Sequence, residues 1–141
     1  MYTIDASVWI NGFDQRELGY DYSKQLLESI RNKGNTIIIP NIVLAEVAGA
    51  ISRTRKNPKQ AIIFTQAMSK LPNVKLIHID KQIARKASQL AAQYALRGAD
   101  SIYAAVAKQF NCVLISLDNE HLTRLKDFLN VQTPESVLKH Q

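Results

Sequence analysis

The stretch Val113-Leu-Ile-Ser-Leu-Asp118 is a short apolar run that ends in an acid, and runs of this kind decide the fold class. Its apolar residues follow one another without the polar alternation of a strand that has one wet face. Tyr2–Ile4 and Thr36–Ile39 are similar runs. Continuous apolar runs are typical of strands in a parallel sheet that helices cover on both faces.

Helical patterns alternate with these runs along the chain. The expected strands are Tyr2–Ile4, Thr36–Ile39, Val74–Ile79, Cys112–Ile115 and an edge strand at Asn130–Gln132. The expected helices are Asp21–Lys33, Asn41–Thr54, Asn57–Lys70, one that Asp80 caps and Gly98 breaks, Ala99–Phe110 and Asn119–Asp127. The alternation predicts a single domain, residues 1–141, with a three-layer α/β/α fold around a central, mainly parallel sheet of four to five strands. Ligands of such folds bind beyond the carboxyl ends of the strands.

The composition is that of a globular protein with a basic surface. The 141 residues are 46% hydrophobic and 21% charged, and the net charge is +6. This charge favours a polyanionic partner, either nucleic acid or an acidic protein, although it could also serve solubility alone. A single cysteine, Cys112, and the lack of a signal peptide or membrane-spanning stretch lead us to expect a cytoplasmic protein.

Four acids stand out because of their apolar or small-residue surroundings: Asp5, Glu46, Asp100 and Asp118. Carboxylates are almost never buried unless they are paired or coordinated. No Lys or Arg lies three or four residues from Glu46, whereas Arg97 lies three residues before Asp100 and could pair with it. Two carboxylates about 4 Å apart repel by roughly 4 kcal/mol at an effective dielectric constant near 20. Four together would need raised pKa values or a divalent cation, and oxygen ligands favour Mg²⁺ or Mn²⁺.

Each acid also has a purely structural explanation. Asp5 and Asp118 could be turn residues after strands, and Asp100 could cap its helix. Glu46 could lie on a helix face that is exposed to solvent. Their common position, where an α/β sheet opens its ligand crevice, favours a shared site.

Five segments resemble the PIN domain family, and within it the VapC-like toxin ribonucleases of type II toxin–antitoxin systems. The most specific segment is Leu96-Arg-Gly-Ala-Asp100-Ser-Ile-Tyr-Ala-Ala, which is similar to the family's Arg-Gly-x-Asp motif before a small-residue helix. The other four are Asp5-Ala-Ser-Val, Leu44-Ala-Glu46-Val, Leu114-Ile-Ser-Leu-Asp118 and the ending Thr133-Pro-Glu-Ser-Val-Leu. The resemblance covers nearly the whole chain, in the family's order.

The resemblance implies a metal-dependent endoribonuclease that cuts single-stranded RNA with Mg²⁺ or Mn²⁺ as its cofactor. It implies that the catalytic and metal-binding residues are Asp5, Glu46, Asp100 and Asp118. Ser7, Ser116, Arg97 and Glu120 would support the site or contact the substrate. Ser116 departs mildly from the more usual Thr and keeps the hydroxyl. The resemblance also implies an antitoxin partner and a homodimer.

Other interpretations stay open at this point. The chain could be a housekeeping PIN nuclease in RNA processing, or an RNA-binding or regulatory PIN module that does not hydrolyse RNA. A receiver-type signalling domain fits less well, since Ala-Ser follows Asp5 and an acid ends the late strand. His121, three residues after Asp118, could support the site. We expect Trp9 and Cys112 to lie in the core.

Overall fold

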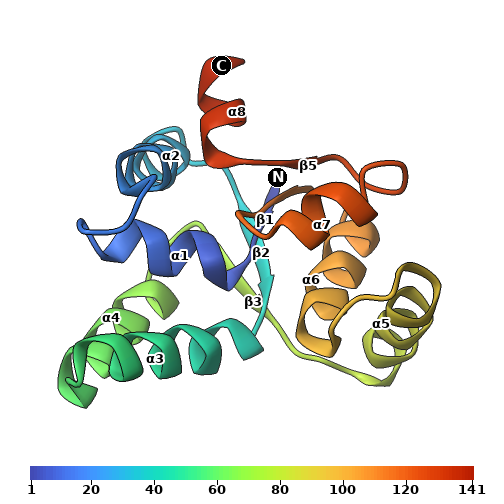
Figure 1. Ribbon diagram of the computed structural model, residues 1–141, viewed down its shortest axis with the longest axis horizontal. Helices are drawn as coiled ribbons and strands as arrows, with labels where there is room; N and C mark the ends of the chain where they lie inside the picture. The colour runs from blue at the N-terminus through green and yellow to red at the C-terminus, as the bar shows by residue number, and fades with distance from the viewer.

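A sheet of five parallel strands forms the centre of the computed structural model, which describes all 141 residues, Met1–Gln141 (Figure 1). The strands are β1 (Tyr2–Ile4), β2 (Ile37–Pro40), β3 (Val74–Ile77), β4 (Val113–Ile115) and β5 (Val131–Gln132). Their order across the sheet is β3-β2-β1-β4-β5, and every neighbouring pair is parallel. Tyr2 lies opposite both Ile37 and Val113 in this register. The predicted three-layer α/β/α fold with a mainly parallel sheet is therefore confirmed.

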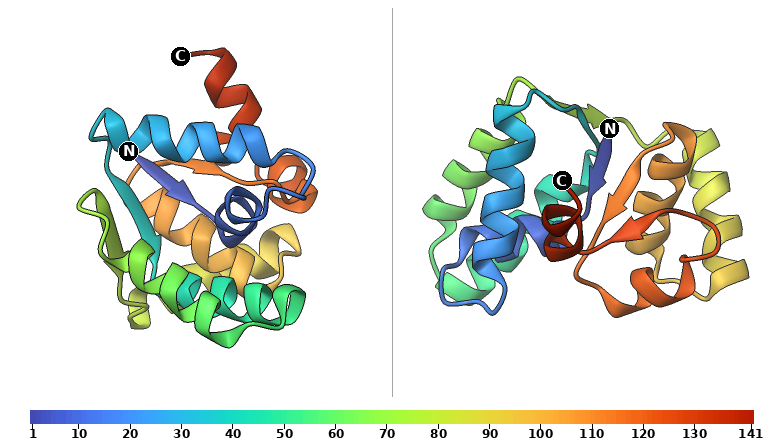
Figure 2. Two further views of the ribbon diagram at one scale, coloured as in Figure 1. Left: turned by 90° about the vertical axis from the view of Figure 1, so that its left-hand side faces the viewer. Right: turned by 90° about the horizontal axis from the view of Figure 1, so that it is seen from above.

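Helices cover both faces of the sheet. They are α1 (Ala6–Phe13), α2 (Tyr20–Asn32), α3 (Ile42–Arg55), α4 (Pro58–Ser69), α5 (Lys81–Tyr94), α6 (Gly98–Gln109), α7 (Asn119–Arg124) and α8 (Pro134–Lys139). Figures 1 and 2 show α1 to α4 on one side of the strands and α5 and α6 on the other. No helix is long and apolar enough to cross a membrane.

Side-chain caps explain where several helices begin. The carboxylate of Asp80 accepts from the backbone N–H of Ile83 at 2.8 Å and so starts α5, as the sequence predicts. The side chain of Asn57 does the same for Gln60 at the start of α4, where Pro58 takes the first helical position. Asn41 holds the cap position before α3, as expected, but its side chain accepts no hydrogen bond from the first turn of the helix.

Two further features differ from the sequence expectation. Helix α5 ends at Tyr94, and its C-cap Ala95 has the left-handed φ of 55°. Gly98 is the first residue of α6 rather than the residue that breaks α5. Helices α1 and α8 are not predicted from the sequence. Their starts depend on Asp5 and Thr133, whose side chains accept from backbone N–H groups of the first turn.

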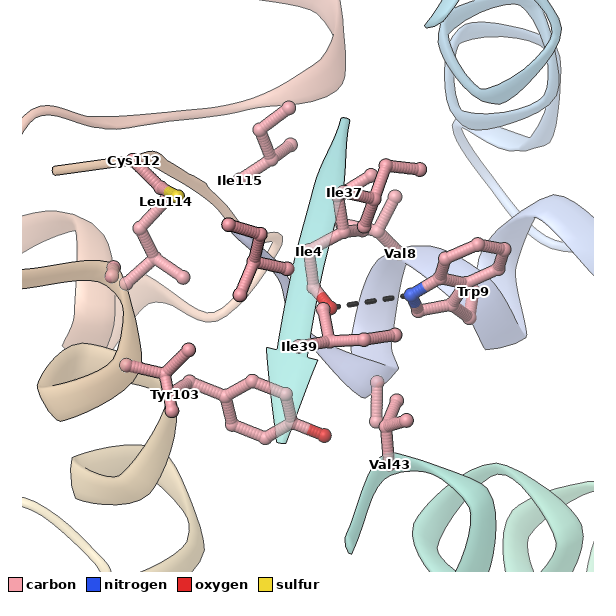
Figure 3. Close-up of a cluster of buried hydrophobic side chains, with 14 of the residues drawn as sticks. Ile4, Val8, Trp9, Ile37, Ile39, Val43, Tyr103, Cys112, Leu114 and Ile115 are labelled. Atoms are coloured by element: carbon pink, nitrogen blue, oxygen red, sulfur yellow. Dashed lines mark hydrogen bonds between the residues drawn. The ribbon is translucent and has the colours of Figure 1, made fainter. Parts of the chain in front are cut away.

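The apolar core holds the ends of the central strands in place. Ile4, Leu114 and Ile115 are fully buried, and side chains of α1, α3 and α6 pack around them (Figure 3). Trp9 is 3% exposed, and its indole N–H donates to the carbonyl of Ile4 at 3.2 Å. Cys112 is 5% exposed, so both residues lie in the core as expected.

The strand order reverses between β1 and β4. The chain builds β1, β2 and β3 outward in one direction, and then crosses back to place β4 on the other side of β1. The N–H of Asp5 donates to the carbonyl of Ile115 at 3.1 Å, which ties the carboxyl ends of the two strands together. Open α/β sheets bind ligands where such a reversal occurs.

Candidate active site

Asp5 lies at the carboxyl end of β1 and has both carboxylate oxygens bound by neighbouring side chains. It is 3% exposed. Its Oδ1 accepts from the backbone N–H and the hydroxyl of Ser7, on α1. Its Oδ2 accepts from the hydroxyl of Ser116, just after β4, and lies 3.0 Å from Nδ1 of His121, on α7. Residues of three different elements therefore fix the orientation of one carboxylate.

Ser7 and Ser116 also bind the segment that follows β4. The hydroxyl of Ser7 accepts from the N–H of Leu117 at 3.1 Å, and the hydroxyl of Ser116 accepts from the N–H of Asp118 at 2.9 Å. The carboxylate of Asp118 in turn caps α7, since its Oδ1 accepts from the N–H of Glu120 at 2.8 Å. The two serines thus connect the positions of Asp5 and Asp118.

Asp100 lies in the first turn of α6, beside the same strand ends. Its side chain is 18% exposed, and its Oδ2 is buried without a hydrogen-bond partner. Burial raises the pKa of Asp100. The nearby charges of His121 and Arg97 lower it and those of Asp118 and Asp5 raise it, with a net increase.

Arg97 lies near three carboxylates, those of Asp100, Asp118 and Glu120, and forms no hydrogen bond with any of them. Its guanidinium nitrogens are 3.7 Å from Oδ2 of Asp100, 3.7 Å from Oδ2 of Asp118 and 3.8 Å from Oε2 of Glu120. The Arg97 side chain is 75% exposed. An exposed cation at these distances lowers the repulsion between the acids by a modest amount and stays free to move.

Glu46 reaches the site from α3 and is held by Tyr103 of α6. The Tyr103 hydroxyl donates to Oε1 of Glu46 at 2.5 Å, and Tyr103 is 1% exposed. Burial raises the pKa of Glu46 and the bond from Tyr103 lowers it, while the charges of Asp100 and Asp5 raise it, so that the net shift is upward. Burial and the neighbouring carboxylate also raise the pKa of Tyr103, which keeps the phenol protonated as a donor.

His121 is the main site residue that the sequence reasoning undervalued. It is fully buried, and its Nε2 lies 3.0 Å from the backbone carbonyl of Asp100 while its Nδ1 faces Asp5. Both partners accept hydrogen bonds, so the network is complete when both ring nitrogens carry a proton. Burial lowers the pKa of His121, but the bonds and charges of Asp5 and Asp100 raise it more. Its position one helical turn after Asp118 is the only sequence signal.

The structure brings all four predicted acids to one end of the sheet, where their charges act on each other. No group of three or more His, Cys, Asp or Glu side chains is arranged so that it could hold a metal ion directly. The chemistry of the donors nevertheless fits a hard divalent cation, since they are carboxylate oxygens and the buried Oδ2 of Asp100 has no hydrogen-bond partner.

Comparisons with known proteins agree with this architecture. The family model of the PIN domain matches residues 2–127. VapC20 of Mycobacterium tuberculosis, described as a sarcin–ricin loop cleaving toxin, has a TM-score of 0.75 at 15% identity, over 92% of this chain and 96% of that chain. VapBC2 from Rickettsia felis, bound to a DNA fragment from its promoter, has a TM-score of 0.71 at 19% identity. That alignment covers 94% of this chain and 97% of the other. A chain of a toxin–antitoxin complex from Klebsiella pneumoniae has a TM-score of 0.69 at 22% identity, over 95% of this chain and 98% of the other. A search of curated protein sequences finds no match.

The raised pKa of His121 predicts that the metal-free protein loses stability as the pH rises above 6.5. Unfolded His121 has released its proton there, whereas the folded protein retains it, so the folded state binds more protons and the free energy of unfolding decreases with pH. This contribution is complete below pH 6.5 and disappears as the pH passes the folded pKa. Urea unfolding in EDTA at a series of pH values measures it.

The variant His121→Phe keeps an aromatic ring at this buried position and cannot titrate. We expect it to be less stable at pH 6, by about 1–3 kcal/mol, because the carbonyl of Asp100 and Oδ2 of Asp5 each lose a donor. Its stability should also decrease less between pH 6.5 and pH 9 than that of the wild type. His78→Phe, at an exposed position, is the control. Equal pH slopes in the His121 variant and the wild type would contradict this account.

Proposed function

This chain belongs to the PIN domain family, and from that premise we propose that it is a metal-dependent endoribonuclease that cleaves single-stranded RNA as the toxin of a toxin–antitoxin pair. The observation that carries the proposal is the convergence of Asp5, Glu46, Asp100 and Asp118 at the strand ends where the sheet order reverses. The presence of all four acids argues against a PIN module that only binds RNA.

The cofactor we propose is Mg²⁺ or Mn²⁺, held by Asp5, Asp100 and Asp118 with Glu46 beside them. The buried, unpartnered Oδ2 of Asp100 supports this assignment. A divalent ion in such a site supplies a water that loses its proton readily and offsets the charge that develops on a cleaved phosphodiester.

Glu46 is the residue we propose to accept a proton from the attacking water. Its raised pKa makes it a better base than an exposed carboxylate, and the bond from Tyr103 to Oε1 fixes the orientation of its carboxyl group. Asp5 has the opposite character: the bonds from Ser7, Ser116 and His121 prevent its rotation. One carboxylate is thus arranged for proton transfer and the other for a fixed position.

Arg97 is the residue we propose to contact the substrate. It is exposed, it lies at the edge of the acidic group, and its distances of 3.7–3.8 Å to three carboxylates leave its hydrogen bonds unmade. A guanidinium can form two parallel bonds to a phosphate group. Glu120, 3.8 Å from Arg97, would limit where that side chain moves.

The antitoxin, the homodimer and the cytoplasmic location are also proposals. The antitoxin is supported by the similarity to chains from toxin–antitoxin complexes over nearly the whole of both chains, whereas the homodimer and the location rest on the family resemblance alone. A housekeeping nuclease would use the same chemistry without an antitoxin. A short reading frame directly upstream of the gene, if one is present, distinguishes the two by co-expression: formation of a stable complex that blocks RNA cleavage supports the toxin, and the absence of such a frame supports the housekeeping nuclease.

Replacing Asp100 with Asn tests the proposed activity. We expect the variant to lose metal-dependent cleavage of single-stranded RNA by at least about 100-fold, because it removes a negative charge and an unpartnered carboxylate oxygen. A fluorescence-quenched RNA, assayed with Mg²⁺, with Mn²⁺ and with EDTA, provides the measurement. Asp21→Asn, an exposed acid on α2, is the matched control. Full activity in the Asp100 variant would overturn the site assignment.

The hydroxyl of Tyr103 is tested by Tyr103→Phe. This variant removes the bond that lowers the pKa of Glu46, so that pKa rises further. We expect the acidic limb of the pH–rate profile to move to higher pH, while the rate on the plateau changes less. Tyr94→Phe on α5 removes a hydroxyl outside the site and should leave the profile unchanged. A profile that moves to lower pH, or does not move, contradicts the proposed base.

A further inference from the structure

A cavity of about 570 Å³ lies between α5 and α6, away from the four acids. Its charged lining consists of cations only: Lys81, Arg85 and Lys86 of α5, and Lys108 of α6. Three glutamines and Ala105 complete it, and no Asp or Glu takes part. We refer to it as the α5–α6 basic cavity.

The positive charges of this cavity have no partner in the protein. None of the four cations forms an ion pair or a side-chain hydrogen bond, although other cations of the chain do both. The ammonium groups of Lys86 and Lys108 lie 5.8 and 4.6 Å from the centroid of the same ring, that of Phe128. A cation–π contact at an exposed position stabilises each of them by only about 0.5–1 kcal/mol.

The acids next to these segments in the sequence neither line the cavity nor form ion pairs with its cations. The Asp80 carboxylate caps α5 by accepting from Ile83, and Asp127, next to Phe128 in the sequence, lines no part of the cavity. Two ammonium groups therefore share one aromatic ring without a counter-ion from the chain. Such a surface attracts anions.

The lining favours a phosphate backbone over a protein partner. Protein interfaces depend on apolar and aromatic anchors and contain few lysines in their centres, whereas Ala105 is the only hydrophobic residue here. Lys, Arg and Gln side chains are instead typical of contacts to phosphate oxygens and sugars. We propose that the α5–α6 basic cavity binds the backbone of single-stranded RNA at a distance from the cleaved bond. This inference rests on the proposed ribonuclease function.

Helix α6 relates the cavity to the acids. Asp100 lies in its first turn and Lys108 in its last, and the step of eight residues from one to the other corresponds to about 12 Å along the helix axis. One strand of a DNA duplex advances about 3.4 Å per nucleotide, which serves as the scale for a stacked strand. The two sites are thus separated by at least about four nucleotides, so only longer RNA can contact both.

The test compares two variants that lower the net charge equally. The cavity variant carries Lys81→Gln, Arg85→Gln, Lys86→Gln and Lys108→Gln, and the control carries Lys24→Gln, Arg31→Gln, Lys33→Gln and Lys70→Gln. The probes are fluorescein-labelled 20-nucleotide and 4-nucleotide RNAs of random sequence. Fluorescence anisotropy in EDTA between 50 and 300 mM KCl gives the slope of log K against log[KCl].

We expect the cavity variant to bind the 20-nucleotide RNA at least about tenfold more weakly at low salt, with a slope shallower by about 2–3, since each lost phosphate contact contributes about 0.7 for a single strand. The control should change the slope by less than 1. The 4-nucleotide RNA offers only a few phosphates, so the difference between the cavity variant and the control should be smaller with this RNA than with the 20-nucleotide RNA. Should the cavity variant not fold, the double variant Lys86→Gln/Lys108→Gln, which keeps Lys81 and Arg85, takes its place. We expect about half the change in slope from this double variant.

Equal slopes in the cavity variant and the control would overturn this inference alone, provided that the wild type cleaves RNA. Loss of binding to a labelled hexaglutamate peptide, with the RNA slope unchanged, would also overturn it in favour of an acidic protein. A wild type that neither binds nor cleaves RNA would refute the proposed function instead.

Discussion

The hydrogen bonds to the carboxylate of Asp5 are the constraint on which the rest of the site depends. Ser7, Ser116 and His121 reach this group from α1, from the end of β4 and from α7. Through them the chain fixes the junction between β1 and β4, where the order of the sheet reverses. His121 extends the same network to the backbone of Asp100, so the start of α6 is aligned with the end of β1.

The site brings carboxylates that repel one another into a partly buried position, and the surrounding groups offset only part of this repulsion. Burial and mutual repulsion raise the pKa values of Glu46 and Asp100. Tyr103, His121 and Arg97 oppose these shifts, each from a different direction. Perturbed carboxylates in a sheet crevice are typical of functional sites. A strand-end arrangement of this kind makes sense for a protein that binds a cation and a phosphate there, since a purely structural role would favour neutral residues.

The sequence predicts the parallel sheet and the meeting of the four acids at one end of it, because continuous apolar runs and isolated carboxylates are local signals. The catalytic and metal-binding roles of these acids stay predictions. The sequence-based prediction fails at His121, where contacts between distant segments decide the role of the residue, and at two local features, the cap of α1 and the end of α5. The sequence does not predict helix α1, because an aspartate after a strand fits a turn as well as the cap that the bond from the N–H of Ser7 makes it. His121 was undervalued because its two partners lie 116 and 21 residues away. The break before α6 falls at Ala95 rather than at Gly98. Ala95 has a left-handed conformation, which a sequence usually signals with a glycine.

The most direct test of the central claim is a crystal structure of the protein grown with Mn²⁺, with data collected at the manganese absorption edge. The account predicts an anomalous peak about 2 Å from carboxylate oxygens of Asp5, Asp100 and Asp118, with the Ser7, Ser116 and His121 bonds to Asp5 intact. The side chains of Asp100 and Asp118 would have rotated toward the ion. A structure without a peak there, at a manganese concentration that supports RNA cleavage, would contradict it.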